Sequence, residues 1–164
     1  MRIIAVDPGF ERLGVAVLEK NLVRETLLFS NCLKTSSKTP SEERLFHVGQ
    51  EIKTIIKKYA PEALAIEKLF FGINKKTAIR LAEARGVVVY EASSAKIPVY
   101  EYTPLQVKIA VTGYGHAPKK QVETMVARLI VMDKKKRTDD EIDAIAIGLT
   151  HFANMKMRNI LKIQ

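Results

Sequence analysis

Tryptophan is absent from the sequence, cysteine occurs once, and long apolar runs are missing. The lone thiol, Cys32, excludes an internal disulfide and cannot build a zinc site by itself. The longest uncharged apolar stretch, residues 144–155, is too short to cross a bilayer. Residues 1–8 lack the basic and apolar regions of a signal peptide. We therefore expect a protein of the reducing cytoplasm without a membrane partner.

Internal repeats, low-complexity tracts and linkers rich in proline or glycine are also missing. The 8 glycines and 6 prolines are spread along the chain, so nothing divides it into separate segments. The apolar fraction of 47% and the charged fraction of 27% are those of an ordinary globular protein. A chain of this length can bury one sizeable core. The sequence thus predicts a single domain over residues 1–164.

Acidic residues are scarce relative to basic ones. The chain has 27 lysines and arginines against 18 aspartates and glutamates, a formal net charge of +9. Such a surplus is typical of proteins that bind a polyanion, either nucleic acid or an acidic membrane. No long basic amphipathic helix with Trp or Phe anchors is visible, so nucleic acid is the favoured partner. A protein that is merely soluble and basic is the alternative that charge alone leaves open.

Hydrophobic periodicity predicts an α/β fold. Short apolar runs bounded by turn residues indicate strands at residues 2–9, 13–20, 22–33, 62–67 and 97–102. Apolar residues at helical spacing indicate helices at residues 39–59, 74–95, 103–111, 118–132 and 137–153. Three strands, one helix and then alternating strand and helix are typical of a mixed five-stranded sheet with helices on both faces.

Three of these helices begin with the pattern of a capping box. In this pattern a threonine side chain and a Glu or Gln three residues later satisfy each other's backbone N–H groups. The pairs are Thr39 with Glu42, Thr103 with Gln106, and Thr138 with Glu141. We expect each pair to close the start of its helix.

Two carboxylates stand where apolar strands end. Asp7 follows "IIAV", and Glu67 follows "ALAI". Ligand sites in open α/β sheets lie at the carboxyl ends of the strands. Each residue also has a plain structural reading, since Asp7 could serve the turn before Pro8 and Glu67 could pair with Lys68.

Two more carboxylates, Asp140 and Asp143, lie three residues apart and so share one helix face. Asp139 and Asp140 could simply complement the helix dipole. Asp143 lies past the first turn among Ile142 and other apolar residues, where an isolated carboxylate costs several kcal/mol unless it is paired, protonated or bound to metal. If all four carboxylates converge, their oxygen ligands suit Mg²⁺ or Mn²⁺, and two such ions ~4 Å apart serve phosphodiester hydrolysis.

Four segments together closely resemble the RuvC family, the bacterial Holliday junction resolvases. They are "VDPG" near the start, "AIEKLFFGINKKTAIRLAEARG", "TPLQVKIAVTGYGHAPKKQV" and "DDEIDAIAIGLTH", in the family's order and spacing. The resemblance implies the ribonuclease H-like fold and a homodimer that cuts two strands of like polarity in a four-way DNA junction. It also implies a divalent metal, with two Mg²⁺ per active site and Mn²⁺ as a substitute, and the RuvAB branch-migration complex as a partner.

The resemblance implies that Asp7, Glu67, Asp140 and Asp143 are the catalytic, metal-binding carboxylates. Asp140 is preferred to Asp139 because its spacing to Asp143 matches the family's D-x-x-D pattern. Asp139 is then a residue of the helix start.

Several lysines are candidates for contact with DNA. Lys75, Lys76, Lys119 and Lys120 lie at two expected helix starts, where cations oppose the helix dipole but phosphates bind well. Lys108 and Lys119 match family lysines near the scissile phosphate, and we place Lys119 with the catalytic residues. Whether these lysines stabilise charge in the transition state or only hold phosphate is open at this point. The alternative is that they are simply solvated.

The resemblance assigns roles to two further features. Phe70, in the "LFFG" segment after Glu67, matches a family phenylalanine that stacks at the junction, whereas Phe71 could equally cap the core. Ala82 and Gly86 belong to a stripe of small residues that permits close approach of a helix, and the resemblance places the dimer contact there. The run "KKKR" at residues 134–137 is interpreted as a solvated loop that adds general attraction for phosphate.

The function predicted from all this is metal-dependent resolution of Holliday junctions by paired symmetric nicks, in DNA recombination and repair. The first alternative is ribonuclease H-type cleavage of RNA–DNA hybrids, which would use similar carboxylates. The second is a DNA-binding module without catalysis on the same fold, which the four carboxylates disfavour.

Overall fold

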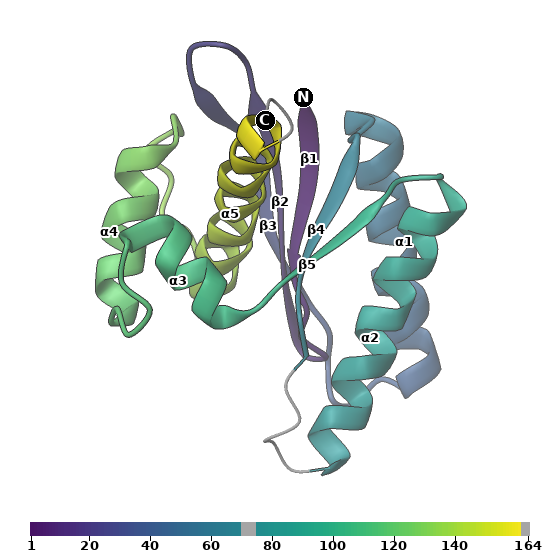
Figure 1. Ribbon diagram of the computed structural model, residues 1–164. Coiled ribbons are helices and arrows are strands. Elements are labelled where there is room, and N and C mark those ends of the chain that lie inside the picture. Colours follow the sequence, from purple (N-terminus) through teal and green to yellow (C-terminus); the bar gives the residue numbers. More distant parts are fainter. Residues whose placement is uncertain (70–74, 162–164) are drawn as a thin grey trace.

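The structure is a computed structural model that describes residues 1–69 and 75–161 (Figure 1). Its strands form a five-stranded sheet in the order β3-β2-β1-β4-β5. The first three strands, β1 (Arg2–Asp7), β2 (Arg12–Lys20) and β3 (Glu25–Lys34), pair antiparallel as a meander. The other two, β4 (Ala63–Glu67) and β5 (Val99–Tyr102), run parallel to β1. The mixed five-stranded sheet expected from the sequence is therefore confirmed.

Helices cover both faces of this sheet (Figure 1). On one face lie α1 (Ser41–Tyr59) and α2 (Lys75–Ser94), and on the other lie α3 (Pro104–Thr112), α4 (Lys119–Leu129) and α5 (Asp139–Leu161). Alternation along β1 explains the two layers, since Ile4 and Val6 pack toward α1 and α2 whereas Ile3 and Ala5 pack toward α5. Each layer buries its own hydrophobic core against the sheet.

Several small side chains lie on the face under α5. Ala5, Ala16 and Ala65 lie there, and a Cβ added to Gly148 of α5 would stand 2.6 Å from a methyl carbon of Leu18. This close approach brings the middle of α5 against β2 and β1. The described helices include none that is both long enough and apolar enough to span a membrane.

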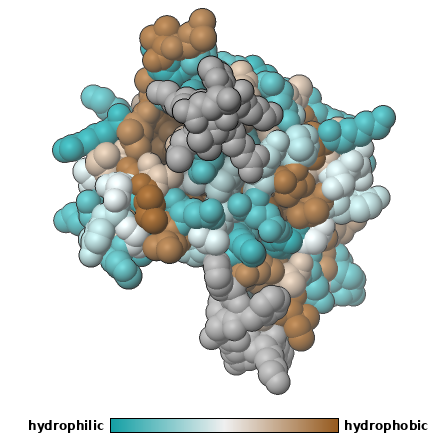
Figure 2. Space-filling model, in the orientation of Figure 1, coloured by the Kyte–Doolittle hydropathy of each residue, from teal (hydrophilic) through white to brown (hydrophobic). Residues whose placement is uncertain are grey.

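Several expected boundaries were wrong. The third strand begins at Glu25 rather than at residue 22, because residues 21–24 form the turn from β2. Helix α4 ends at Leu129 rather than at residue 132, because Val131 forms a parallel bridge with Thr26 of β3. The turn between β2 and β3 carries the fully exposed Leu22 and Val23. In Figure 2 this turn appears as a hydrophobic patch at the top of the view. It lies at the opposite end of the sheet from Asp7.

Two of the three capping boxes are present. The Thr103 side chain accepts from the backbone of Gln106, whose side chain accepts in return, and Thr138 pairs with Glu141 in the same way. The third expectation was wrong, because α1 starts after Pro40 and has no side-chain cap, so Thr39 and Glu42 do not form a box.

Candidate active site

The site begins at the carboxyl ends of two neighbouring parallel strands. Val6 of β1 is paired with Ile66 of β4, so the residues that follow, Asp7 and Glu67, emerge side by side from the same edge of the sheet. Both side chains are half-buried. The topology thus brings together two carboxylates that are separated by most of the first half of the chain.

Helix α5 brings two more carboxylates to this edge. Asp7 is paired with Gly14 of β2, and a Cβ added to Gly14 would stand only 2.0 Å from the carbonyl oxygen of Asp140. Only a glycine fits this approach, so β2 holds the first turn of α5 beside the end of β1. Asp140 and Asp143, one turn apart on α5, thereby lie close enough to Asp7 for their charges to act on it.

Burial and mutual repulsion together shift the pKa values of these carboxylates. Burial raises the pKa of Asp7 to about 8, and the negative charges of Glu67, Asp143 and Asp140 add to that rise. Burial also raises the pKa of Glu67, again with help from Asp143. An upward shift with these causes marks carboxylates that lack enough positive charge nearby.

Lys119, the first residue of α4, partly neutralises the cluster. Its Nζ lies 3.4 Å from Oδ2 of Asp143 and 3.2 Å from Oδ2 of Asp139. The pKa of Asp143 is still raised, because burial outweighs the favourable charge of Lys119. Desolvation acts to lower the pKa of Lys119, but the hydrogen bonds and charges of Asp139 and Asp143 together raise it above its ordinary value. Asp139, expected only to start the helix, therefore also contacts a site lysine.

Arg12 is a site residue that the sequence reasoning missed. Its guanidinium donates from Nε and Nη2 to Oδ2 of Asp140, at 2.9 Å and 2.5 Å. Burial acts to raise the pKa of Asp140, but the hydrogen bond and charge of Arg12 hold it below its ordinary value. Cys32 Sγ lies 3.5 Å from the same oxygen. A signal did exist, since a meander returns Arg12 to the edge where Asp7 leaves the sheet.

As oriented here, the acidic groups do not surround a single point. Within residues 1–69 and 75–161, no three acidic, histidine or cysteine side chains are placed to ligate one ion. Arg12 and Lys119 hold Asp140 and Asp143, and repulsion among the carboxylates favours such spreading. The donor set itself suits a hard divalent cation, because it consists of carboxylate oxygens with unbalanced negative charge.

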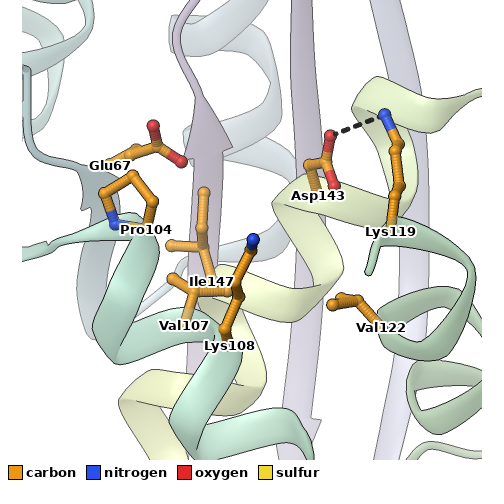
Figure 3. A pocket seen from close by; sticks show the side chains of 8 residues that line it. All are labelled: Glu67, Pro104, Val107, Lys108, Lys119, Val122, Asp143 and Ile147. Atoms are coloured by element: carbon orange, nitrogen blue, oxygen red, sulfur yellow. Dashed lines mark hydrogen bonds and ion pairs between the residues drawn. The ribbon is translucent and has the colours of Figure 1, made fainter. Parts of the chain in front are cut away.

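A pocket of about 280 Å³ opens beside the carboxylates (Figure 3). Glu67 and Asp143 line it together with Lys108 and Lys119. Its apolar wall consists of Pro104, Val107, Val122 and Ile147. Side chains from β4, α3, α4 and α5 thus combine two anionic and two cationic groups around a space open to solvent.

Of the remaining expected site residues, the structure describes only some. Phe70 and Phe71 lie outside the described residues. Lys75 and Lys76 form the first turn of α2, and their side chains are likewise not described. Lys120 is exposed at the start of α4 next to Lys119.

Comparison with known proteins agrees with this geometry. The family model described as "Crossover junction endodeoxyribonuclease RuvC" matches residues 3–151. A protein of that name from Thermosipho melanesiensis is 45% identical over 148 residues, covering 90% of this chain and 94% of the relative. Its namesake from Halothermothrix orenii is 44% identical over 151 residues, 92% of each chain.

Solved structures give the same result. Thermus thermophilus RuvC in complex with a Holliday junction substrate has a TM-score of 0.90 at 35% identity, and 96% of each chain is covered. The yeast mitochondrial Holliday junction resolvase has a TM-score of 0.68 at 12% identity, which supports the fold alone. These likenesses confirm the ribonuclease H-like α/β fold. The chain, with its four carboxylates at one edge of the sheet, belongs to the RuvC family of crossover junction endodeoxyribonucleases.

Proposed function

We propose that this protein resolves four-way DNA junctions by hydrolysing one phosphodiester bond in each of two opposed strands. The observation that carries the proposal is the convergence of Asp7, Glu67, Asp140 and Asp143 on one edge of the sheet. An enzyme that cleaves phosphodiesters must stabilise negative charge on the phosphate, and an acidic cluster can do so only with cations bound to it. Membership of the RuvC family supplies the class of substrate.

We infer that the four carboxylates hold divalent metal, namely two Mg²⁺ ions for which Mn²⁺ can substitute. When bound, such ions lower the pKa of a bound water and stabilise charge on the phosphate. The chain contributes the ligands and their placement. Asp7 and Glu67 are fixed by adjacent strands, whereas Asp140 and Asp143 are fixed by the close contact between Gly14 and the start of α5.

Lys108 and Lys119 are the residues we assign to the scissile phosphate. Both line the pocket beside Glu67 and Asp143, so a phosphate bound at the carboxylates lies within reach of two ammonium groups. We place Lys119 with the catalytic residues because it already contacts Asp143. Lys75, Lys76 and Lys120 are proposed as backbone contacts at helix starts, and Phe70 as the residue that stacks on a base.

Paired cuts require two active sites, and we propose that α2 forms the contact of a two-fold dimer. Ala82 and Gly86 are exposed on this helix, and a Cβ added to Gly86 would meet no atom of the described residues within 4 Å apart from its own stretch of helix. Two large apolar side chains are also exposed along the helix, Ile79 at 61% and Tyr90 at 67%. An exposed helix face that mixes small and apolar residues suits a second copy of itself.

The cellular setting follows from the same family membership. We propose that the protein works in the cytoplasm on junctions processed by the RuvAB branch-migration complex. We further infer that residues 1–164 act as one nuclease domain.

The direct test is incubation with Mg²⁺ and a mobile four-way junction, beside linear duplex and RNA–DNA hybrid controls. The proposal predicts paired nicks in the junction that DNA ligase can seal, and little cutting of either control. Cutting of the hybrid alone would instead identify a ribonuclease H-type enzyme. Junction binding without any cutting in Mg²⁺ or Mn²⁺ would identify a binding module.

A further inference from the structure

The segment from Asp133 to Thr138, here called the basic loop, connects α4 to α5 along the edge of the sheet. The residues that lead into this loop are hydrogen-bonded to β3. Val131 N donates to the carbonyl oxygen of Glu25 at 3.0 Å, and Leu27 N donates to the carbonyl oxygen of Val131 at 2.9 Å. The loop then presents three consecutive lysines, Lys134, Lys135 and Lys136, all of them exposed. A merely solvated loop would not need this anchoring.

The buried side chain of Arg137 holds the loop in its conformation. Its side chain is only 7% exposed, and its Nη2 lies 2.5 Å from Oδ1 of Asp133. Nη1 donates to the carbonyl oxygens of Asp133 and Lys135, at 3.2 Å and 3.1 Å. Nε donates to Oγ of Ser30 on β3 at 3.0 Å. One guanidinium thus folds the loop on itself and fastens it to the sheet.

The same network reaches the helix that carries Asp140 and Asp143. Ser30 Oγ donates to Oε1 of the buried Glu141 at 2.7 Å. Glu141 Oε2 accepts from the backbone N–H of Thr138 at 2.9 Å and so caps the start of α5. The backbone that carries the three lysines is therefore fixed relative to the start of α5.

The charges of these lysines are available to a ligand. In the part of the chain that the structure describes, the ion pairs include none with Lys134, Lys135 or Lys136, whereas the nearby Asp133 and Asp139 pair with Arg137 and Lys119. The basic loop, α4 and the start of α5 line a pocket of about 560 Å³ that is open to solvent. Asp139 lines this pocket and contacts Lys119 of the catalytic pocket, so the two spaces adjoin.

We propose that the basic loop is a preorganised contact for DNA backbone phosphates next to the cut, and that Arg137 is the residue that positions it. This inference rests on the proposed function. A strand with one phosphate at the carboxylates places neighbouring phosphates beside α5, where Lys134, Lys135 and Lys136 can bind them. Holding three like charges together is unfavourable in the free protein, and a bound polyanion relieves it.

The test is the salt dependence of junction binding, measured in chelator so that no cleavage occurs. The variant K134Q/K135Q/K136Q should lower the slope of log Kd against log salt by up to ~3 units, since each phosphate contact contributes about 0.9. The control K53Q/K57Q/K58Q removes three exposed charges from α1, on the other face of the sheet, and should leave the slope nearly unchanged.

Arg137 is tested with R137Q/D133N, which keeps the net charge of the wild type and all three lysines. The positioning role predicts a lower slope for this variant too, with folding checked by circular dichroism. A wild-type slope in R137Q/D133N would overturn that role. A triple-lysine slope equal to that of the α1 control would overturn the whole inference. If the wild type itself binds no junction, the proposed function fails instead.

Discussion

Within the acidic cluster, the ionisation of Asp7 is expected to affect the stability of the folded protein most. Its pKa of about 8 in the folded protein exceeds the ordinary value of 3.8. A carboxyl whose pKa is raised by folding contributes stability below its unfolded pKa, and that stability is lost as the pH rises through the folded pKa. We therefore expect the metal-free protein to lose stability between about pH 4 and pH 8.

Thermal melting in chelator across that range tests the expectation, with Asp7→Asn as the comparison. The variant cannot ionise at this position, so its melting temperature should fall less between pH 6 and pH 8 than that of the wild type. Identical pH profiles for the two proteins would show that Asp7 is not the strained group.

Arg12 should act as an internal counter-ion for Asp140. Replacing it by Gln removes the hydrogen bonds that hold the pKa of Asp140 low, and it leaves the four carboxylates less compensated. We expect Arg12→Gln to melt lower than the wild type in chelator and to gain more from Mg²⁺, because a competitor for Asp140 is gone. Arg24→Gln, at the exposed turn between β2 and β3, is the control. A smaller Mg²⁺ gain in Arg12→Gln would mean that Arg12 supports metal binding instead.

Individual side chains show where reasoning from sequence reaches its limit. Asp7 and Glu67 could be placed together because the ends of apolar strands share an edge, and Asp140 and Asp143 because their spacing is helical. The meander places Arg12 at the same edge as Asp7, but its pairing with Asp140, 128 residues away, could not be predicted because it depends on the packing of α5 on β2.

Among the elements, the contact between β2 and α5 fixes the geometry of the site. Because a Cβ on Gly14 would overlap the carbonyl oxygen of Asp140, a side chain there must push the first turn of α5 away from the sheet. Overpacking a tight contact costs typically ~1–3 kcal/mol. Gly14→Ala should lose about that much stability in denaturant unfolding and should also weaken stabilisation by Mg²⁺. A variant with wild-type stability and metal response would show that the helix is not held this closely.

The order of strands and helices could be predicted because burial on one or two faces leaves periods of two and 3.6 in the sequence. The ends of the helices were harder to predict from the sequence. Residues 130–132 continue the apolar pattern of α4, yet Val131 leaves the helix to pair with β3, a contact between distant parts of the chain. Thr39 is a residue type that often caps a helix, but Pro40 occupies the N-cap position of α1.

Because α2 is the proposed dimer contact, substitutions on its exposed face should prevent dimer formation. Arginine at Ala82 or Gly86 would place a charge in a close helix contact, so each variant should be a folded monomer that no longer makes paired cuts. Light scattering after size exclusion measures the mass, and Gln50→Arg on exposed α1 is the control. If both variants remain dimers, α2 is not the interface.

At the scale of the whole molecule, the proposed function requires that the four carboxylates form a cluster whose charge is balanced by bound metal. Two unit charges 5 Å apart repel by about 3 kcal/mol at an effective dielectric of 20, before solvent and proton uptake reduce it. Asp143→Asn removes one such charge and keeps the shape. It should abolish or nearly abolish cleavage while the variant still binds the junction. Asp139→Asn, which also loses a contact with Lys119, should retain cleavage.

The most direct measurement is thermal melting of Asp143→Asn and wild type, each in chelator and in Mg²⁺. Because burial keeps the pKa of Asp143 raised despite Lys119, the variant should melt higher than the wild type without metal. Mg²⁺ should then stabilise the variant less than the wild type. If Asp143→Asn melts lower in chelator and gains as much from Mg²⁺, Asp143 is a structural partner of Lys119, and the acidic cluster is not a metal site.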